Sequence, residues 1–203
     1  MLDIELNVVF QKLCQIAPTK YCTSIHLSNE CITVGQAHSS VWACLVCVKV
    51  ISLYSLLPGR VVNVSSMASS SALGGCSQEL QRKFRSDTIT EEELVELMTK
   101  FVEDTKKSVH EKEGWPNSAY GVSKIGVTVL SRIQARVLNE KRKGDHILLN
   151  ACCPGWVRTD MAGPQATKSP DEGAETPVYL ALLPSDAGGP HGQFVSDKTV
   201  RTW

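Results

Sequence analysis

From residue 60 onward, short continuous runs of apolar residues alternate with longer segments in which apolar residues recur every three or four positions. The short runs are rich in Val, Ile and Leu and adjoin turn residues such as Pro58-Gly59 and Pro154-Gly155. Runs of this kind are typical of strands that are buried on both faces. We predict three such strands, over residues 60–66, 147–153 and 192–196.

The first of the longer segments predicts a helix that begins after Thr90. Thr90 is followed three residues later by Glu93, which is the spacing of a capping box. Apolar residues then continue at helical spacing as far as Val109, and Gly114-Trp115-Pro116 is predicted to end the helix.

Two more helices are predicted nearer the end of the chain. One begins near Asn117-Ser118 and continues to about residue 140, and the other covers residues 172–183 with Pro177 in its first turn. Small and polar residues dominate 67–75 and 164–170, so both segments are predicted to be loops.

The predicted order is strand, helices, strand, helix, strand. Continuous apolar strands separated by helices indicate a parallel sheet with helices on both faces. We therefore assign the chain to the α/β class, as a doubly wound parallel sheet. Three strands are few for a sheet of this type.

Residues 1–57 show no comparable pattern. Among them, Val41 to Leu57 is an apolar run with one charge, Lys49, and it is shorter than the roughly 20 residues that a membrane-spanning helix needs. We expect a buried helix or strand there, with membrane attachment as the alternative. Asp3 and Glu5 stand where a secretory signal would be basic, so we expect reduced cysteines and a cytoplasmic location.

Composition and charge narrow the classes of function. The 203 residues are 42% hydrophobic, which is enough for one globular domain with a core. Lys and Arg together number 21, as do Asp and Glu, so the formal net charge is zero. A nucleic-acid-binding protein usually carries a basic surface, so we expect no nucleic-acid partner.

Tyr120 and Lys124 form the most informative pair of chemical groups. They stand four residues apart in a predicted helix, so their side chains share one face. A phenol has an ordinary pKa of about 10, and a neighbouring ammonium group lowers it by stabilising the phenolate. Such a pair can donate a proton to a carbonyl oxygen near neutral pH. The alternative is an exposed Tyr and Lys on an ordinary helix.

Two further elements are predicted to meet this pair at one edge of the sheet. Ser65 and Ser66 end the first strand, and the turn from Pro154 to Asp160 follows the second. In an open parallel sheet, ligands bind beyond the carboxyl ends of the strands. The hydroxyl group of Ser66 is therefore placed to hydrogen-bond a substrate oxygen, or else to cap the following turn.

These motifs resemble the short-chain dehydrogenase/reductase superfamily: Asn63-Val64-Ser65-Ser66, Tyr120 with Lys124, and Pro154-Gly155 with Thr159. From about Gly59 to Trp203, the chain is similar to the C-terminal half of NADPH-dependent carbonyl reductases of the monomeric type. The stretches that carry this closer resemblance are KFVEDTKKSVHEKEGWP (100–116), ACCPGWVRTDMAGP (151–164) and EGAETPVYLALLP (172–184).

The resemblance implies a Rossmann-type fold, NADPH as cofactor, and carbonyl compounds such as aldehydes, ketones and quinones as substrates. It also implies a monomer, with a helical insertion between the Ser66 and Tyr120 motifs. Tyr120 would protonate the carbonyl oxygen, Lys124 would lower the pKa of the phenol and hold the cofactor ribose, and Ser66 would orient the carbonyl.

Other residues of these motifs would line the same site. The resemblance implies cofactor contacts from Pro154, Gly155, Val157, Arg158 and Thr159. It implies substrate contacts from Met67 and Trp156. Cys153 would lie beside the pocket, either as a reactive thiol or as a small buried residue. No metal ligand is expected.

Residues 1–57 depart from this family. Its glycine-rich turn, which binds pyrophosphate, has no counterpart here, since Gly35 is the only glycine before Gly59. We therefore interpret the chain as one N-terminally truncated domain, with an atypical segment over 1–57 and the C-terminal part of a reductase domain over 58–203. Impaired NADPH binding and weak or absent turnover are predicted, and the alternative function is an inactive module that binds a substrate or a partner.

Two other kinds of site are compatible with isolated motifs. Ser65 and Ser66 follow a strand, as a hydrolase nucleophile does, but no GxSxG turn surrounds them. Cys44 and Cys47 form a CxxC pair, but no second pair of metal ligands follows it, so packing explains them better.

Overall fold

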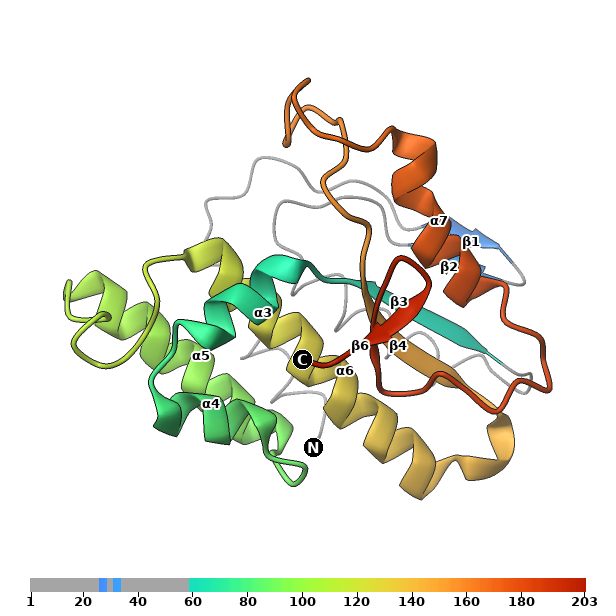
Figure 1. Ribbon diagram of the computed structural model, residues 1–203. Helices are drawn as coiled ribbons and strands as arrows, with labels where there is room; N and C mark the ends of the chain where they lie inside the picture. Colours follow the sequence, from blue (N-terminus) through green and yellow to red (C-terminus); the bar gives the residue numbers. More distant parts are fainter. Residues whose placement is uncertain (1–25, 29–30, 34–58) are drawn as a thin grey trace.

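The computed structural model describes residues 26–28, 31–33 and 59–203 (Figure 1). Its larger sheet has the strand order β3-β4-β5-β6, in which β3, β4 and β5 are parallel and β6 is antiparallel to β5. These strands are β3 (Arg60–Val64), β4 (Leu148–Cys153), β5 (Phe194–Ser196) and β6 (Thr199–Arg201). Strands β1 (His26–Ser28) and β2 (Cys31–Thr33) form a separate antiparallel pair.

Helices connect the parallel strands. Between β3 and β4 the chain forms α3 (Met67–Gly74), α4 (Gln78–Arg85), α5 (Glu91–Lys106), α6 (Ala119–Lys141) and the short 3-10 helix η1 (Lys143–Asp145). Between β4 and β5 it forms α7 (Pro170–Ala181).

Helices α6 and α7 cover opposite faces of the sheet (Figure 1). On one face, Val61 and Leu149 pack with Ala135 of α6. On the other face, Cys152 packs with Leu180 of α7. All six residues of β4 are buried because helices cover both of its faces. The predicted α/β class and the doubly wound sheet are therefore confirmed.

Side chains at the helix N-termini explain where several helices begin. The hydroxyl group of Thr90 accepts a hydrogen bond from the amide of Glu93 (3.2 Å), and the Glu93 carboxylate accepts one from the amide of Thr90 (2.9 Å). This geometry confirms the predicted capping box. Ser118 caps α6 through the amide of Gly121 (3.1 Å), at the predicted start of that helix.

The prediction of a loop over residues 67–75 was wrong. Ser66 caps a helix there, α3, even though its sequence is dominated by small and polar residues. Ala72 and Leu73 are buried in a cluster with Val122 and Ile125 of α6. Packing against α6 therefore stabilises a helix that local propensity does not favour.

Four details of the other elements also differ from prediction. Helix α5 ends at Lys106 and does not reach Val109, because Ser108 takes a positive φ of 56°. Pro177 lies inside α7, whose first position is occupied by Pro170. Neither α4 nor the antiparallel strand β6 was predicted, and the three residues of β6 are all exposed.

Some predictions concern residues beyond those described. The apolar run Val41–Leu57 and the pair Cys44 and Cys47 lie outside the described residues. In the ranges that the structure describes, no helix combines the length and the apolar character needed to cross a bilayer.

Replacing Gly121 with Ala tests the close contact between α3 and α6. A Cβ atom at Gly121 would lie 2.5 Å from Ala72 Cβ and 3.1 Å from the Ala68 carbonyl oxygen, so the two helices would have to separate. We expect Gly121→Ala to lower the free energy of unfolding by about 1–3 kcal/mol. Urea unfolding followed by circular dichroism measures this change.

Gly126→Ala, in the same helix, is the matched control. The nearest atom to a Cβ atom there is the flexible end of Met98, at 3.3 Å. This substitution should cost less than Gly121→Ala, because Met98 can move and Ala favours the helix. Equal losses of stability in the two variants would contradict the tight contact at Gly121.

Candidate active site

The end of β3 positions Ser66. The backbone of Ser66 is extended (φ −160°, ψ 152°), and its hydroxyl group accepts a hydrogen bond from the amide of Ala68 at 3.1 Å. Its carbonyl oxygen accepts two bonds from Ser69, one from the amide (2.9 Å) and one from the hydroxyl group (2.7 Å). Ser66 therefore caps α3 and is held at the carboxyl end of the strand. This capping role is one of the two alternatives predicted for its hydroxyl group.

The first turns of α6 position Tyr120 and Lys124. The two side chains lie on one face, with Lys124 Nζ 5.7 Å from the centre of the Tyr120 ring, within the range of a cation–π contact. Lys124 is 6% exposed, whereas Tyr120 is 50% exposed. Lys124 Nζ also donates a hydrogen bond to the carbonyl oxygen of Val64 at 3.0 Å. The ammonium group therefore lies between the phenol ring and the end of β3.

A row of buried polar contacts, which the sequence analysis did not single out, fixes α6 on β3. Ser65 Oγ donates to the carbonyl oxygen of Lys124 (3.1 Å) and lies 2.7 Å from Thr128 Oγ1. Asn63 Nδ2 donates to Ser131 Oγ at 2.9 Å. The sequence did carry a signal for this row: residues 120, 124, 128 and 131 follow the spacing of a single helix face.

The turn after β4 supplies the third element of the site. Gly155 has a φ of +88°, a conformation that L side chains rarely adopt, and a Cβ atom there would lie 2.8 Å from Lys168 Cδ. After this turn, the backbone of residues 156–158 forms hydrogen bonds with Lys168, across the loop. The amide of Arg158 donates to the Lys168 carbonyl oxygen, and the amide of Lys168 donates to that of Trp156, both at 2.9 Å.

The remaining predicted residues also lie on this loop or beside it. Val157 forms a β-bridge with Lys168, and the guanidinium group of Arg158 donates to the Ala166 carbonyl oxygen at 3.0 Å. Thr159 Oγ1 lies 3.5 Å from the carbonyl oxygen of Val157. These polar side chains therefore hold the loop itself.

The register of the sheet brings these elements to one edge. Val64 at the end of β3 pairs with Cys152 near the end of β4, so Ser66 and the turn that begins at Pro154 leave the sheet at neighbouring points. Three large apolar or aromatic side chains beside this edge are about half-exposed: Met67, Tyr120 and Trp156. The edge thus combines a phenol, a buried ammonium group, a strand-end hydroxyl and apolar side chains, which are the parts that proton donation to a bound carbonyl requires.

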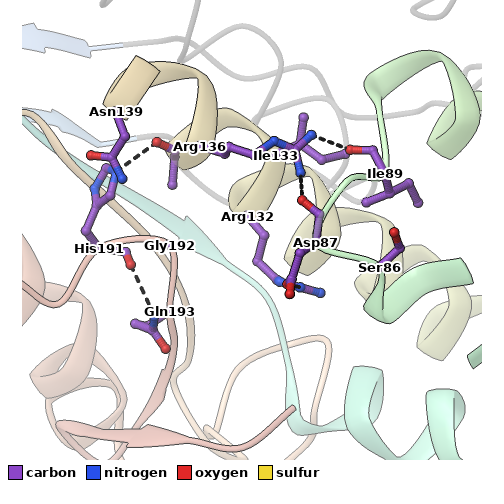
Figure 2. Close-up of a pocket in the computed structure, with 11 residues that line it drawn as sticks. Ser86, Asp87, Ile89, Arg132, Ile133, Arg136, Asn139, His191, Gly192 and Gln193 are labelled. Carbon is purple, nitrogen blue, oxygen red and sulfur yellow. Dashed lines mark hydrogen bonds and ion pairs between the residues drawn. The ribbon is translucent and has the colours of Figure 1, made fainter. Parts of the chain in front are cut away.

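A hollow of about 300 Å³ lies elsewhere, beside the second half of α6 (Figure 2). None of the predicted site residues lines it. Its polar groups bind the protein's own backbone: Arg136 binds the carbonyl oxygens of Asp87 and Ile89, and His191 lies 2.9 Å from that of Ala135 and accepts from the amide of Leu149. These contacts tie loops to α6, and we assign the hollow no part in the chemistry.

The two cysteines at the end of β4 are both buried. Cys152 is fully buried, and Cys153 is 4% exposed. Cys153 Sγ accepts a hydrogen bond from the amide of Gly155 at 3.3 Å, so this thiol helps to hold the turn. Burial, followed by the neighbouring Cys153, raises the pKa of Cys152 to about 12, although the charge of Lys124 acts in the opposite direction.

The architecture and the edge just described define a class of protein. A parallel sheet with helices on both faces is a Rossmann-type arrangement. Two solved reductases share it. Salutaridine reductase from Papaver somniferum matches with a TM-score of 0.64 and 30% identity, over 75% of this chain and 50% of that chain. Menthone neomenthol reductase from Mentha piperita matches with a TM-score of 0.59 and 31% identity, over 78% and 48%.

Sequence relatives define the group more closely. Over 145 residues, the chain is 81% identical to carbonyl reductase (NADPH) 1 of Homo sapiens and of Mus musculus. The matched segment is 71% of this chain and 52% of each relative, so the chain spans about half the length of the curated relatives it matches. No family model matches the chain. The matched segment is homologous to carbonyl reductases, and the predicted resemblance is confirmed.

The raised pKa of Cys152 predicts slow alkylation of the folded protein. At pH 8, a thiol with a pKa of about 12 should react about a thousandfold more slowly than one with the ordinary value of 9.0, since only the thiolate attacks. Iodoacetamide labelling followed by peptide mass spectrometry measures the rate at this position. The same protein in urea is the control, and equal rates in the folded and unfolded states would contradict the burial of Cys152.

Proposed function

We propose that residues 58–203 carry the C-terminal part of a reductase domain, and that its site reduces carbonyl compounds with NADPH. The placement of Lys124 carries this proposal. Its ammonium group lies 3.0 Å from the Val64 carbonyl oxygen and 5.7 Å from the ring centre of Tyr120, so a positive charge lies beside the phenol ring. The homologous relatives are carbonyl reductases that take their name from NADPH, and the proposed substrate class and cofactor follow from them.

In this proposal, the chain's own residues transfer one proton to the substrate and bind its carbonyl oxygen. The Tyr120 hydroxyl group donates its proton to the carbonyl oxygen of the substrate, and Lys124 stabilises the phenolate that remains. Ser66 orients the carbonyl and stabilises its developing negative charge. Met67 and Trp156 supply apolar contacts to the substrate. Overall, carbonyl compound, NADPH and one proton give alcohol and NADP⁺.

NADPH, when bound, supplies a hydride to the carbonyl carbon. The described residues are compatible with the nicotinamide half of such a cofactor, since Lys124 binds the carbonyl oxygen of Val64, whose register partner Cys152 stands two residues before the turn that begins at Pro154. The pyrophosphate half has no matching glycine-rich turn in the sequence before Gly59. We therefore expect NADPH to bind weakly and turnover to be slow.

A second candidate function is a module without catalysis. It is favoured by one observation, that the chain spans about half the length of relatives that are carbonyl reductases by name. Such a module would keep the half-exposed apolar side chains of Met67, Tyr120 and Trp156 as a binding surface for a carbonyl compound or a partner.

An NADPH titration followed by a turnover assay distinguishes the two functions. We expect saturable NADPH binding and slow reduction of a quinone or an aldehyde. Tyr120→Phe should reduce the rate at least about 100-fold, because it removes the proton donor and little else. Tyr179→Phe, which alters a partly exposed tyrosine on α7, is the matched control and should leave the rate unchanged.

The rate of Tyr120→Phe and the NADPH titration test different parts of the proposal. Equal rates in the wild type and in Tyr120→Phe would contradict the proposed role of the phenol. A folded protein that binds no NADPH would favour the module without catalysis.

We also propose that the protein is a monomer in the cytoplasm. Residues of α4 and α5, such as Phe84 and Phe101, are buried in one cluster with residues of α6, so this insertion covers part of the α6 surface. We expect one sedimenting species with the mass of a single chain in analytical ultracentrifugation. A species of twice that mass at micromolar concentration would contradict the proposal.

A further inference from the structure

Trp203 is far from Ser66 in the sequence, yet its side chain contacts α3, the helix that Ser66 caps. The chain end labelled C in Figure 1 lies beside α6, after the hairpin of β5 and β6. Trp203 Nε1 donates a hydrogen bond of 2.7 Å to Ser69 Oγ in α3. The indole ring packs against the helical core cluster and also against the cluster of Ala151, Cys153 and Phe194. Trp203 thus joins the sheet to the first turns of α3.

Ser69 relays this contact to Ser66. Its side chain is fully buried, and its hydroxyl group both accepts from Trp203 and donates to the Ser66 carbonyl oxygen, each at 2.7 Å. A buried hydroxyl group that accepts one bond has its remaining proton directed at a single acceptor, and hydrogen bonds in such a chain strengthen one another. The orientation of the Ser69 hydroxyl is therefore set by the indole.

The carbonyl group of Ser66 is part of the backbone from which its hydroxyl group projects. That hydroxyl already accepts a bond from the amide of Ala68, so its direction depends on how the first turn of α3 is held. If Trp203 no longer orients the Ser69 hydroxyl group, the Ser66 carbonyl oxygen keeps the Ser69 amide as its one fixed donor, and the capping geometry at Ser66 loosens.

We propose that Trp203 is a positioning residue for Ser66, acting through the hydroxyl group of Ser69. This inference rests on the proposed function, in which Ser66 orients the substrate carbonyl. Trp203 itself does not touch the reacting atoms in this arrangement.

Amide hydrogen exchange measured by NMR on the full chain tests the positional link without relying on turnover. The Ala68 amide reports the Ser66 cap, and the Glu93 amide, which is bound to Thr90 Oγ1, reports an equivalent cap elsewhere. Trp203→Phe keeps a large ring but removes the N–H donor. We expect it to speed exchange at Ala68 by up to about fivefold, the full effect of losing one hydrogen bond, and to leave Glu93 unchanged.

Two further variants make the comparison specific. Ser69→Ala removes the relay and also the hydroxyl's own bond to the Ser66 carbonyl, so it should speed exchange at Ala68 at least as much as Trp203→Phe, and the double variant should match Ser69→Ala. Trp115→Phe is the matched control, since it also removes a buried indole donor, the one bound to Asp104 at 3.0 Å. It should affect Ala68 no more than Glu93. Equal acceleration at Ala68 and Glu93 in Trp203→Phe would overturn the inference, because Trp203 would then act only through overall stability.

Turnover gives the second readout. We expect Trp203→Phe to lower kcat about threefold to tenfold while the KM for NADPH is unchanged, and to have no further effect in a Ser66→Ala background. A reduction that persists in that background would overturn the inference. If the folded wild type binds NADPH but turns nothing over, the proposed function fails, while the exchange at Ala68 still decides whether Trp203 positions Ser66.

Discussion

The contact of α6 with β3 is the interaction on which the rest of this structure depends. Apolar packing holds the two elements together, but apolar packing alone would tolerate small shifts of the helix. The buried polar groups of Asn63, Ser65, Thr128 and Ser131 do not tolerate them. Each bond adds only about 0.5–1.5 kcal/mol net, whereas a buried polar group left without a partner costs about 1–3 kcal/mol. A shifted helix would lose several partners at once, so these bonds fix one register.

The same register of α6 on β3 places Lys124 and Tyr120 in the candidate site. Burying a lysine ammonium group is costly unless it finds a partner, and Lys124 finds the Val64 carbonyl oxygen where β3 ends. The row continues one helical turn earlier to Tyr120, which is half-exposed where ligands of a parallel sheet bind. A lysine that contributes to the packing of the fold therefore also supplies the charge beside the phenol. The buried bonds that fix α6 on β3 therefore also fix the positions of these two side chains.

Much of this arrangement is encoded locally and was predictable. The continuous apolar runs, the Thr90–Glu93 capping box and the spacing of Tyr120 and Lys124 each depend on residues that are neighbours in sequence. Residues 67–75 show the limit of such reasoning. Their composition favours a loop, but α3 forms because Ala72 and Leu73 are buried against a helix some 50 residues away.

Contacts between residues that are distant in sequence could not be predicted either, because they leave no local pattern. The bond from Trp203 to Ser69 joins residues 134 positions apart, and no local pattern announces it. The row of Asn63, Ser65, Thr128 and Ser131 is an intermediate case. Its helical half follows a readable spacing, but its partners on β3 become visible only when the strand and the helix are placed together.

The chain separates two tasks that a reductase site normally combines. Holding a dinucleotide depends mainly on phosphate contacts, which a glycine-rich turn and a helix N-terminus provide. Protonating a carbonyl depends on the geometry of a few side chains, which here comes from the contact of α6 with β3. Binding energy that is equal in ground and transition states lowers KM without raising kcat. Under the proposed function, the chain should therefore lose cofactor affinity first, while the contact of α6 with β3 still holds Tyr120 beside Lys124.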